Sequence, residues 1–305
     1  MSKVPTRTNL RVGDGPKRPT GLDDKRFLVG LGAQKAGSTW LARWLGAHPQ
    51  AYVSRLKELH YFDVVYQPEV RGYANDRMIR LAKEMAVGLV RPDGRPNPKK
   101  LEKLVAVVDR LQMTADKRYH YLQFFLDRVT DERIFCDITP AYALLDADGF
   151  AAIDTMHPDI RYVFLLRDPI DRFWSALRMG VRKMEGFDPV KRFEEMLDHP
   201  EHFGRSDYGR TIDELEKVVP ADRVLYVFYE DLFRQESVDG IADFLGIDRM
   251  PAKFDMVVNP SAKIDLPADS HRVAMAKFRH VYDYAFDRFG DAVPSRWRTS
   301  LATAT

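Results

Sequence analysis

The sequence has almost no cysteine, no long apolar run and almost no net charge. Cys136 is the only cysteine in 305 residues, so no disulfide can form within the chain. The longest apolar stretches, such as residues 162–166, are strand-sized and far shorter than the roughly 20 residues that cross a bilayer. The first residues also lack the apolar core of a secretory signal. We therefore expect a cytoplasmic protein without a transmembrane segment.

Positive and negative charges are balanced, with 47 Lys and Arg against 45 Asp and Glu and a formal net charge of +2. So small a charge creates no overall field that would attract nucleic acid or an acidic membrane, and nucleic acid is not an expected partner. Any anion must therefore be bound by a local arrangement of residues. Hydrophobic residues at 45% and charged residues at 30% are the proportions of a folded globular protein.

The first 24 residues differ in composition from the rest of the chain. They mix five Lys or Arg with prolines and glycines and have no apolar period. We predict that residues 1–24 form a flexible basic arm and that residues 25–305 form a single domain. The oligomeric state cannot be predicted from these features.

Five short apolar runs are typical of strands, and helical patterns alternate with them. The expected strands cover residues 27–31, 51–53, 133–137, 162–166 and 224–228. This alternation predicts an α/β fold with a central, mainly parallel sheet flanked by helices. Helices are expected at residues 38–47, 100–113 and 119–129. The last two belong to a helical insertion of about 75–130, which we expect to act as a lid over a substrate cleft.

The segment Gly32–Trp40 leaves the first strand as a glycine-rich turn. Such a turn lets the backbone approach an anion, and the following helix directs unpaired N–H groups and its positive end at it. Gly32 and Gly37 have the spacing of the glycines in a nucleotide-binding P-loop, but Ser38 stands where that motif has lysine. The lysine is Lys35, inside the loop, which disfavours a kinase that uses Mg²⁺ and a nucleoside triphosphate. Lys35 could instead neutralise the leaving group of a single anhydride. The alternative is an ordinary connection between a strand and a helix.

A second candidate anion site follows the fourth expected strand. Arg167 stands at the carboxyl end of that strand, where open α/β sheets bind ligands, and a guanidinium can hold a phosphate through two parallel hydrogen bonds. Pro169 suits the first turn of a helix, and Ser175 lies further along it. In an alternative interpretation, Arg167 pairs with Asp168 or Asp171.

Both segments resemble the donor-binding elements of sulfotransferases that use 3′-phosphoadenosine-5′-phosphosulfate (PAPS). Residues 34–41 are similar to the loop that binds the 5′-phosphosulfate, and residues 166–175 to the element that binds the 3′-phosphate. The resemblance implies the P-loop-like nucleotide-binding fold of that family, with Arg167 and Ser175 on the 3′-phosphate. Trp40 would stack on the adenine, unless it is a core aromatic of the first helix. The residues implied at the 5′-phosphosulfate are Lys35, Ala36, Gly37, Ser38 and Thr39.

The acceptor site is predicted from residues 57–62, which follow the second expected strand. An attacking hydroxyl must lose a proton, and a positioned Glu or His can take it. This run is similar to a segment of glycan sulfotransferases, such as the heparan sulfate type, whose Glu is the proposed base. The resemblance implies Glu58 as the catalytic base, with His60 as its competitor, and an acceptor hydroxyl on a carbohydrate or glycolipid. Alternatively, Glu58 pairs with Lys57 or Arg55 and His60 only packs.

Residues 137–142 resemble another element of the glycan enzymes, which lines the acceptor cleft. Ile138 replaces the lysine of that element, which removes a cation that would help to bind an acidic polysaccharide. Thr139 and Tyr142 are candidate cleft residues, although a turn at Pro140 explains them equally well.

Near the C-terminus, Lys263 lies where sulfotransferases fold a basic loop over the nucleotide, and it is a further candidate for donor binding, with Arg272 ranked below it. The histidines show no metal-ligand spacing, so no metal is expected. The sequence thus predicts a PAPS-dependent sulfotransferase. The alternatives are a P-loop nucleotide kinase and a non-catalytic module that binds a nucleotide or glycan.

Overall fold

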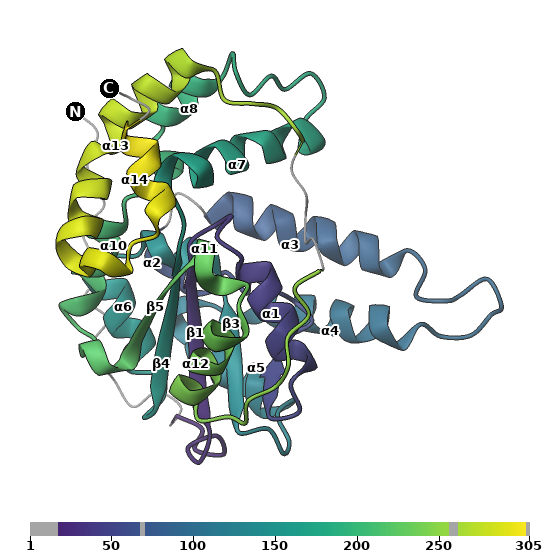
Figure 1. The fold of residues 1–305 in the computed structure, drawn as a ribbon. Helices are drawn as coiled ribbons and strands as arrows, with labels where there is room; N and C mark the ends of the chain where they lie inside the picture. Colours follow the sequence, from purple (N-terminus) through teal and green to yellow (C-terminus); the bar gives the residue numbers. More distant parts are fainter. Residues whose placement is uncertain (1–17, 68–70, 256–261, 303–305) are drawn as a thin grey trace, which may run out of the picture.

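Five parallel strands form the centre of the fold (Figure 1). The computed structural model describes residues 18–67, 71–255 and 262–302. The strands pair in the order β2-β3-β1-β4-β5. Their bounds are β1 (Arg26–Gly32), β2 (Ala51–Val53), β3 (Ile134–Ile138), β4 (Ile160–Leu166) and β5 (Val224–Phe228). The predicted α/β fold is confirmed, and each expected strand is found within two residues of its predicted bounds.

The central strand β1 determines where the site lies. All but its first residue are buried, because it has a neighbouring strand on each side and helices over both faces. Phe27 of β1 stacks on Phe135 of β3 with 4.6 Å between the ring centres. The backbone N–H of Ala33, just after β1, donates to the oxygen of Leu165 in β4 at 2.7 Å. Because the strands are parallel, the carboxyl ends of β1, β3 and β4 lie along one edge of the sheet.

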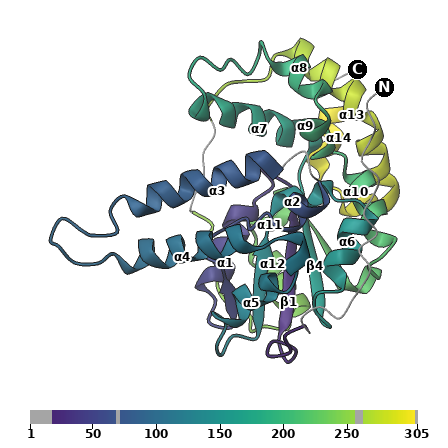
Figure 2. The same cartoon turned by 180° about the vertical axis from the view of Figure 1, so that it is seen from behind.

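Helices cover both faces of this sheet (Figures 1 and 2). The face turned to the viewer in Figure 1 carries α1 (Ser38–Ala47), α11 (Tyr229–Leu232) and α12 (Gln235–Leu245). The opposite face, in front in Figure 2, carries α2 (Phe62–Tyr66), α5 (His120–Leu126) and α6 (Ala147–Asp154). Other helices of the body are α7 (Pro169–Lys183), α8 (Phe193–Asp198), α9 (Pro200–Gly204), α10 (Tyr208–Glu216), α13 (Ala268–Phe289) and α14 (Ser295–Ala302).

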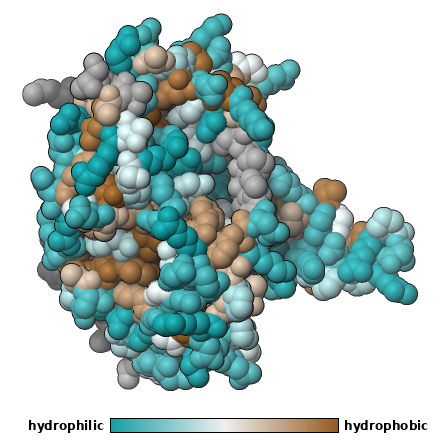
Figure 3. Space-filling model, in the orientation of Figure 1, coloured by the Kyte–Doolittle hydropathy of each residue, from teal (hydrophilic) through white to brown (hydrophobic). Residues whose placement is uncertain are grey.

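Two helices of the predicted insertion project from the body as a hairpin (Figures 1 and 2). They are α3 (Arg71–Ala86) and α4 (Pro98–Gln112). The predicted insertion also included α5, but α5 belongs to the body, since Tyr121 packs against Phe27 of the central strand. The candidate lid is therefore the α3–α4 hairpin alone. Its surface is mostly hydrophilic on the face seen in Figure 3.

Within the described ranges, no helix is long and apolar enough to cross a membrane. Residues 1–17 of the predicted basic arm lie outside the described residues. Arg18, near the end of the arm, forms an ion pair with Asp23 at 2.5 Å. The assignment of residues 25–305 to a single domain stays a prediction.

Candidate functional site

The loop between β1 and α1 has the geometry of an anion cradle. Gly37 is the N-cap of α1, with a left-handed φ of 94°, and as a glycine it has no side chain that could cap this helix. Lys35 also has a left-handed backbone, with a φ of 70°. The turn brings the N–H groups of Ser38 and Thr39 to the carboxyl edge of the sheet, while Ala36 is buried beneath it. The positive end of α1 favours a negative group at this position.

Glycine is the residue type that best adopts the left-handed backbone at position 37. Replacing Gly37 should therefore lower the stability of the folded protein. A Cβ at Gly37 would lie 2.5 Å from Cδ2 of Leu232, at a φ that L residues rarely adopt. We expect Gly37→Ala to lower the free energy of unfolding by about 1–3 kcal/mol, measured by urea denaturation. A matched control is Gly240→Ala in α12, where a Cβ would meet nothing within 4 Å. Equal stability of the two variants would contradict the strained turn.

Arg167 joins the second predicted anion-binding segment to the first. Its Nη1 donates to the backbone oxygen of Lys35 at 2.9 Å, across 132 residues of sequence. Its guanidinium lies 4.4 Å from the centre of the Tyr229 ring. Its Nε is buried and has no hydrogen-bond partner in the described part of the chain. A buried guanidinium N–H without an acceptor fits an anionic ligand.

The alternative interpretation, in which Arg167 pairs with the acids that follow it, is wrong. Asp168 is the N-cap of α7, and its Oδ1 accepts from the backbone N–H groups of Ile170 and Asp171 at 3.0 Å each. Asp171 forms an ion pair with Arg296 of α14 at 2.7 Å. Both acids thus serve the start of α7 and its contact with the C-terminal helix.

Helix α7 adds a buried hydroxyl and a second guanidinium. Ser175 is 4% exposed, and Arg178 follows three residues later on the same face of the helix. Burial and the positive charge of Arg167 lower the pKa of Arg178. Within the described ranges, Nε of Arg178 is also buried without a partner. Arg178 was not predicted, although its spacing from Ser175 on a helix is a signal that could have identified it. These groups together fit a phosphate.

Trp40 is packed inside the body. It is 3% exposed, and its Nε1 donates to the backbone oxygen of Lys253 at 3.2 Å. Its ring stacks on Phe254 with 5.7 Å between centres and meets Phe233 edge-on at 5.4 Å. These are the contacts of a core aromatic, and the stacking of Trp40 on adenine stays a prediction.

Lys263 is exposed in a segment that is held against α7. Trp174 and Arg178 of α7 donate to the backbone oxygens on either side of it, at 2.9 and 3.3 Å. The segment therefore runs beside the helix that carries the predicted 3′-phosphate contact, and donor binding by Lys263 stays a prediction. Arg272 forms a surface ion pair with an acid of its own helix. Residues 259–261 lie outside the described residues.

The predicted proton acceptors lie in the loop between β2 and α2. Glu58 and His60 have positive φ angles of 66° and 54°, and with Lys35 they are the three non-glycine residues with positive φ in the described part of the chain. A left-handed backbone costs such a residue about 1–3 kcal/mol and persists where surrounding contacts enforce it, often at functional sites. The three residues predicted to be catalytic therefore coincide with the strained positions of the backbone.

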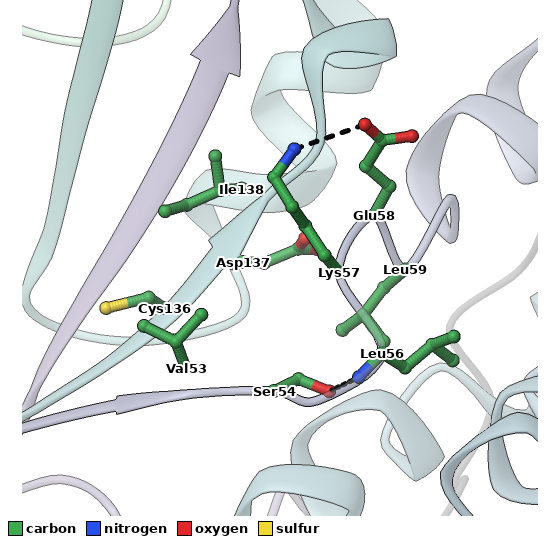
Figure 4. Close-up of a pocket in the computed structure, with 9 residues that line it drawn as sticks. All are labelled: Val53, Ser54, Leu56, Lys57, Glu58, Leu59, Cys136, Asp137 and Ile138. Carbon is green, nitrogen blue, oxygen red and sulfur yellow. Dashed lines mark hydrogen bonds and ion pairs between the residues drawn. The ribbon is translucent and has the colours of Figure 1, made fainter. Parts of the chain in front are cut away.

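A small pocket lies between this loop and the end of β3 (Figure 4). Lys57 and Glu58 line one side of it, and Asp137 and Ile138 line the other. The Glu58 side chain points toward the Lys57 ammonium, with Oε1 3.2 Å from Nζ. The predicted pairing of Glu58 with Lys57 is thus confirmed, whereas Arg55 pairs with an acid of α4 instead.

The Glu58 carboxylate is surrounded by positive charge and by a histidine. Its Oε2 lies 2.6 Å from Nη1 of Arg77, in the projecting helix α3, and 3.4 Å from Nε2 of His60. Burial alone would raise the pKa of Glu58, but the hydrogen bond with His60 and the charges of Lys57 and Arg77 hold the pKa well below its usual 4.5. Glu58 is therefore an ionised carboxylate at neutral pH.

His60 is held between an acid and the same arginine. Its Nδ1 lies 2.6 Å from Oδ2 of Asp63, and its Nε2 lies 2.6 Å from Nη1 of Arg77. Burial alone would lower the pKa of His60, but the hydrogen bonds to Asp63 and Glu58 raise it. Arg77 can only donate, so its contact at Nε2 requires the neutral ring, which has a lone pair there to accept. Both candidate bases thus contact Arg77, which was not predicted.

Asp137 anchors a buried hydrogen-bond network beneath the loop. Its carboxylate accepts from the hydroxyls of Tyr121, Thr139 and Tyr142 at 2.7–2.8 Å. Burial raises the pKa of Asp137 despite these three bonds. Thr139 and Tyr142 are both 0% exposed, so the prediction that they line an open cleft is wrong. They support the loop from below, because the Tyr142 hydroxyl also accepts from the backbone N–H of Tyr61 at 3.2 Å.

The candidate site therefore has one half that fits an anion and another half that could accept a proton. The start of α1, Lys35, Arg167 and α7 form the first half, and Glu58 and His60 form the second, both at the carboxyl edge of the sheet. Across residues 18–67, 71–255 and 262–302, no three His, Cys, Asp or Glu side chains are grouped to hold a metal ion. The arrangement can stabilise an anionic leaving group and take a proton from an attacking hydroxyl.

Comparison with solved structures shows the same fold in another protein. The chain is 19% identical to a sulfotransferase from Alicyclobacillus acidocaldarius, with a TM-score of 0.60 over 90% of this chain and 98% of that one. The sulfotransferase domain of the Synechococcus PCC 7002 olefin synthase is 20% identical, with a TM-score of 0.45 over 80% of this chain and 78% of that one. No curated protein matches the sequence significantly.

A family model describes most of the sequence. The model of the sulfotransferase family matches residues 28–251. This range includes the loop before α1, the loop with Glu58 and His60, and the whole of α7. Since the match extends over more than half of the chain, and includes both segments predicted to bind the donor, this chain belongs to the sulfotransferase family.

Proposed function

We propose that this chain transfers a sulfuryl group from PAPS to the hydroxyl of a carbohydrate or glycolipid in the cytoplasm. The observation that supports this most directly is the hydrogen bond from Arg167 to the Lys35 oxygen, because it joins the two segments predicted to bind opposite ends of the donor. The residues present fit a ligand with two separate anionic groups. One position is the start of α1, where the N-cap Gly37 has no side chain, and the other has two buried Nε–H groups, of Arg167 and Arg178, without partners in the described residues.

The chain's own residues would divide the work between the two ends of the donor. PAPS, when bound, supplies the sulfuryl group and the 3′,5′-bisphosphate leaving group. Lys35 and the N–H groups at the start of α1 stabilise negative charge at the 5′ end, where it increases as the sulfuryl group departs. Arg167 and Ser175 hold the 3′-phosphate, and Arg178 adds a second guanidinium beside them. Fixing both ends aligns the reacting groups.

Glu58 acts as the base in this proposal. It is ionised, and its pocket opens at the same edge of the sheet as the anion cradle. His60, whose Nδ1 is hydrogen-bonded to Asp63, is the competing base. The acceptor class rests on the similarity of residues 57–62 to glycan sulfotransferases, and Ile138 in the pocket argues against a strongly acidic polysaccharide.

Replacing Arg167 should weaken binding of the 3′-phosphate selectively. We expect Arg167→Met to raise the Kd of adenosine 3′,5′-bisphosphate by about 10–100-fold, because a hydrogen bond to a charged group contributes about 1.5–3 kcal/mol. The Kd of adenosine 5′-monophosphate, which lacks the 3′-phosphate, should change little. Isothermal calorimetry measures both constants, and Arg296→Met, which removes an exposed arginine paired with Asp171, is the control. An equal loss of affinity for both nucleotides would contradict a 3′-phosphate role.

The proposed function is tested by transfer of labelled sulfate from PAPS to a panel of glycosides and glycolipids without added metal. A kinase would instead consume ATP in a Mg²⁺-dependent reaction, and a non-catalytic module would bind the bisphosphate without transfer to any acceptor. Failure of the wild-type protein to bind adenosine 3′,5′-bisphosphate would overturn the proposal.

A further inference from the structure

The loop that carries Glu58 needs an external support. Glu58 and His60 are both left-handed at non-glycine positions, so the segment does not hold this shape by its own preference. Leu56, Lys57, Glu58 and Leu59 of the loop line a small pocket against the end of β3 (Figure 4). The direction of the Glu58 carboxylate therefore depends on what fixes the neighbouring peptides.

Arg110 of α4 provides that support. Its side chain is deeply buried, with 1% of the residue exposed, and its Nε and Nη2 donate to the backbone oxygens of Leu59 and His60. No carboxylate of the described residues forms an ion pair with Arg110, although Asp63 and Asp137 lie close enough for their charges to act on it. A buried guanidinium is normally paired with an acid. Here two adjacent peptide oxygens take its place.

The same hairpin also holds the side chains of the loop. Arg77 of α3 contacts Glu58 and His60, while Arg110 of α4 contacts the peptides between and after them. The two helices pack together along the hairpin that projects from the body (Figure 2). The hairpin therefore contacts the Glu58 loop in two ways: Arg77 contacts its side chains, and Arg110 binds its backbone.

We propose that Arg110 is a positioning residue for Glu58: by binding the peptide oxygens of Leu59 and His60, it fixes the left-handed loop that aims the carboxylate at the acceptor hydroxyl. This inference rests on the proposed function. It gives the α3–α4 hairpin a role in the reaction itself, in addition to its predicted role as a lid. Arginine suits this position better than lysine, because one lysine ammonium cannot make the same two parallel bonds to neighbouring oxygens.

The test compares Arg110→Met and Arg110→Lys with Arg210→Met. Arg210 is a matched control, because it also donates to backbone oxygens, those of Ala143, Leu144 and Leu145, none of which belongs to the Glu58 loop. With labelled PAPS and the best acceptor of the glycoside panel, we expect Arg110→Met to lower kcat by about 10–100-fold while the KM for PAPS changes less than twofold. Arg110→Lys should recover part of the loss, and Arg210→Met should change kcat less than threefold.

Two further measurements keep the outcome interpretable. Nitrogen-15 NMR of the His60 ring should show a changed pKa in both Arg110 variants and none in Arg210→Met, and circular dichroism identifies any variant that does not fold. If Arg110→Met does not fold, the positioning role is tested with Arg110→Lys alone. A folded Arg110 variant with wild-type kcat and an unchanged His60 signal would overturn the positioning role. Failure of the wild type to bind adenosine 3′,5′-bisphosphate would instead overturn the proposed function.

Discussion

Replacing Glu58 by Gln is expected to lower kcat for sulfuryl transfer by about 10²–10⁴-fold, the usual contribution of a general base. Gln keeps the size of the side chain and can still bond to Lys57 or Arg77 through its oxygen, but it cannot take a proton. The Kd of adenosine 3′,5′-bisphosphate should stay within twofold of the wild type, because the residues proposed to bind the donor lie in another part of the site. Initial rates with labelled PAPS and calorimetry measure the two quantities.

The control for this variant is Glu102→Gln. Glu102 is half exposed and pairs with Arg55 on the outer side of the same loop, so its loss removes a nearby negative charge without touching the pocket. We expect its kcat to stay within a factor of two of the wild type, since exposed ion pairs contribute little. A rate for Glu58→Gln equal to that of Glu102→Gln would exclude Glu58 as the base.

The pH dependence of the rate decides between Glu58 and His60. The pKa of Glu58 lies well below 4.5, so this base stays deprotonated and active as the pH falls, and the rate should decline only below about pH 4.5. The pKa of His60 is raised above 6.5, so a His60 base would become protonated, and the rate would decline, as the pH falls from above 6.5. We expect the first profile in the wild type. A decline centred above pH 6.5 that His60→Gln abolishes would assign the role to His60.

The parts of the site that the sequence predicts correctly are those determined by local chain chemistry. A glycine-rich exit from a buried strand and an early Pro169 specify turns and helix starts within a few residues, so α1 and α7 begin where expected. Arg167 could be predicted as an anion-binding candidate because it lies directly after the end of a strand. The partner of Arg167 could not be predicted in this way. Asp168 follows Arg167 directly and was an equally plausible acceptor, but in the structure Asp168 caps α7.

The parts that the sequence does not predict depend on how distant elements dock. Arg77 and Arg110 resemble the many solvent-exposed cations of helical segments, and nothing local distinguishes the two that contact the Glu58 loop. Thr139 and Tyr142 show the reverse error, since polar residues in a familiar element were expected in an open cleft. The buried carboxylate of Asp137 accepts both of their hydroxyls, which allows these polar side chains to be buried.

Removing the Lys35 amine is expected to lower kcat by about 10²–10³-fold, the usual cost of losing a group that stabilises developing negative charge. Asn is the replacement to use, because it tolerates the left-handed φ of 70° at this position better than most residues and so leaves the turn intact. Lys35→Asn should also weaken binding of adenosine 3′,5′-bisphosphate by roughly tenfold or more, since that product carries the charge which Lys35 would neutralise.

A matched control is Lys277→Met, which removes a half-exposed lysine of α13 that pairs with Asp198 far from the cradle. Its kcat and its Kd for the bisphosphate should both stay within twofold of the wild type. Binding of adenosine 3′-monophosphate, which lacks the 5′-phosphate, separates a direct contact from a collapsed loop: a direct contact leaves this affinity unchanged in Lys35→Asn, whereas disruption of the Arg167 contact to the Lys35 oxygen lowers it. If Lys35→Asn matched the control in both rate and bisphosphate affinity, the loop would bind no leaving group. Lys35 would then have no catalytic role.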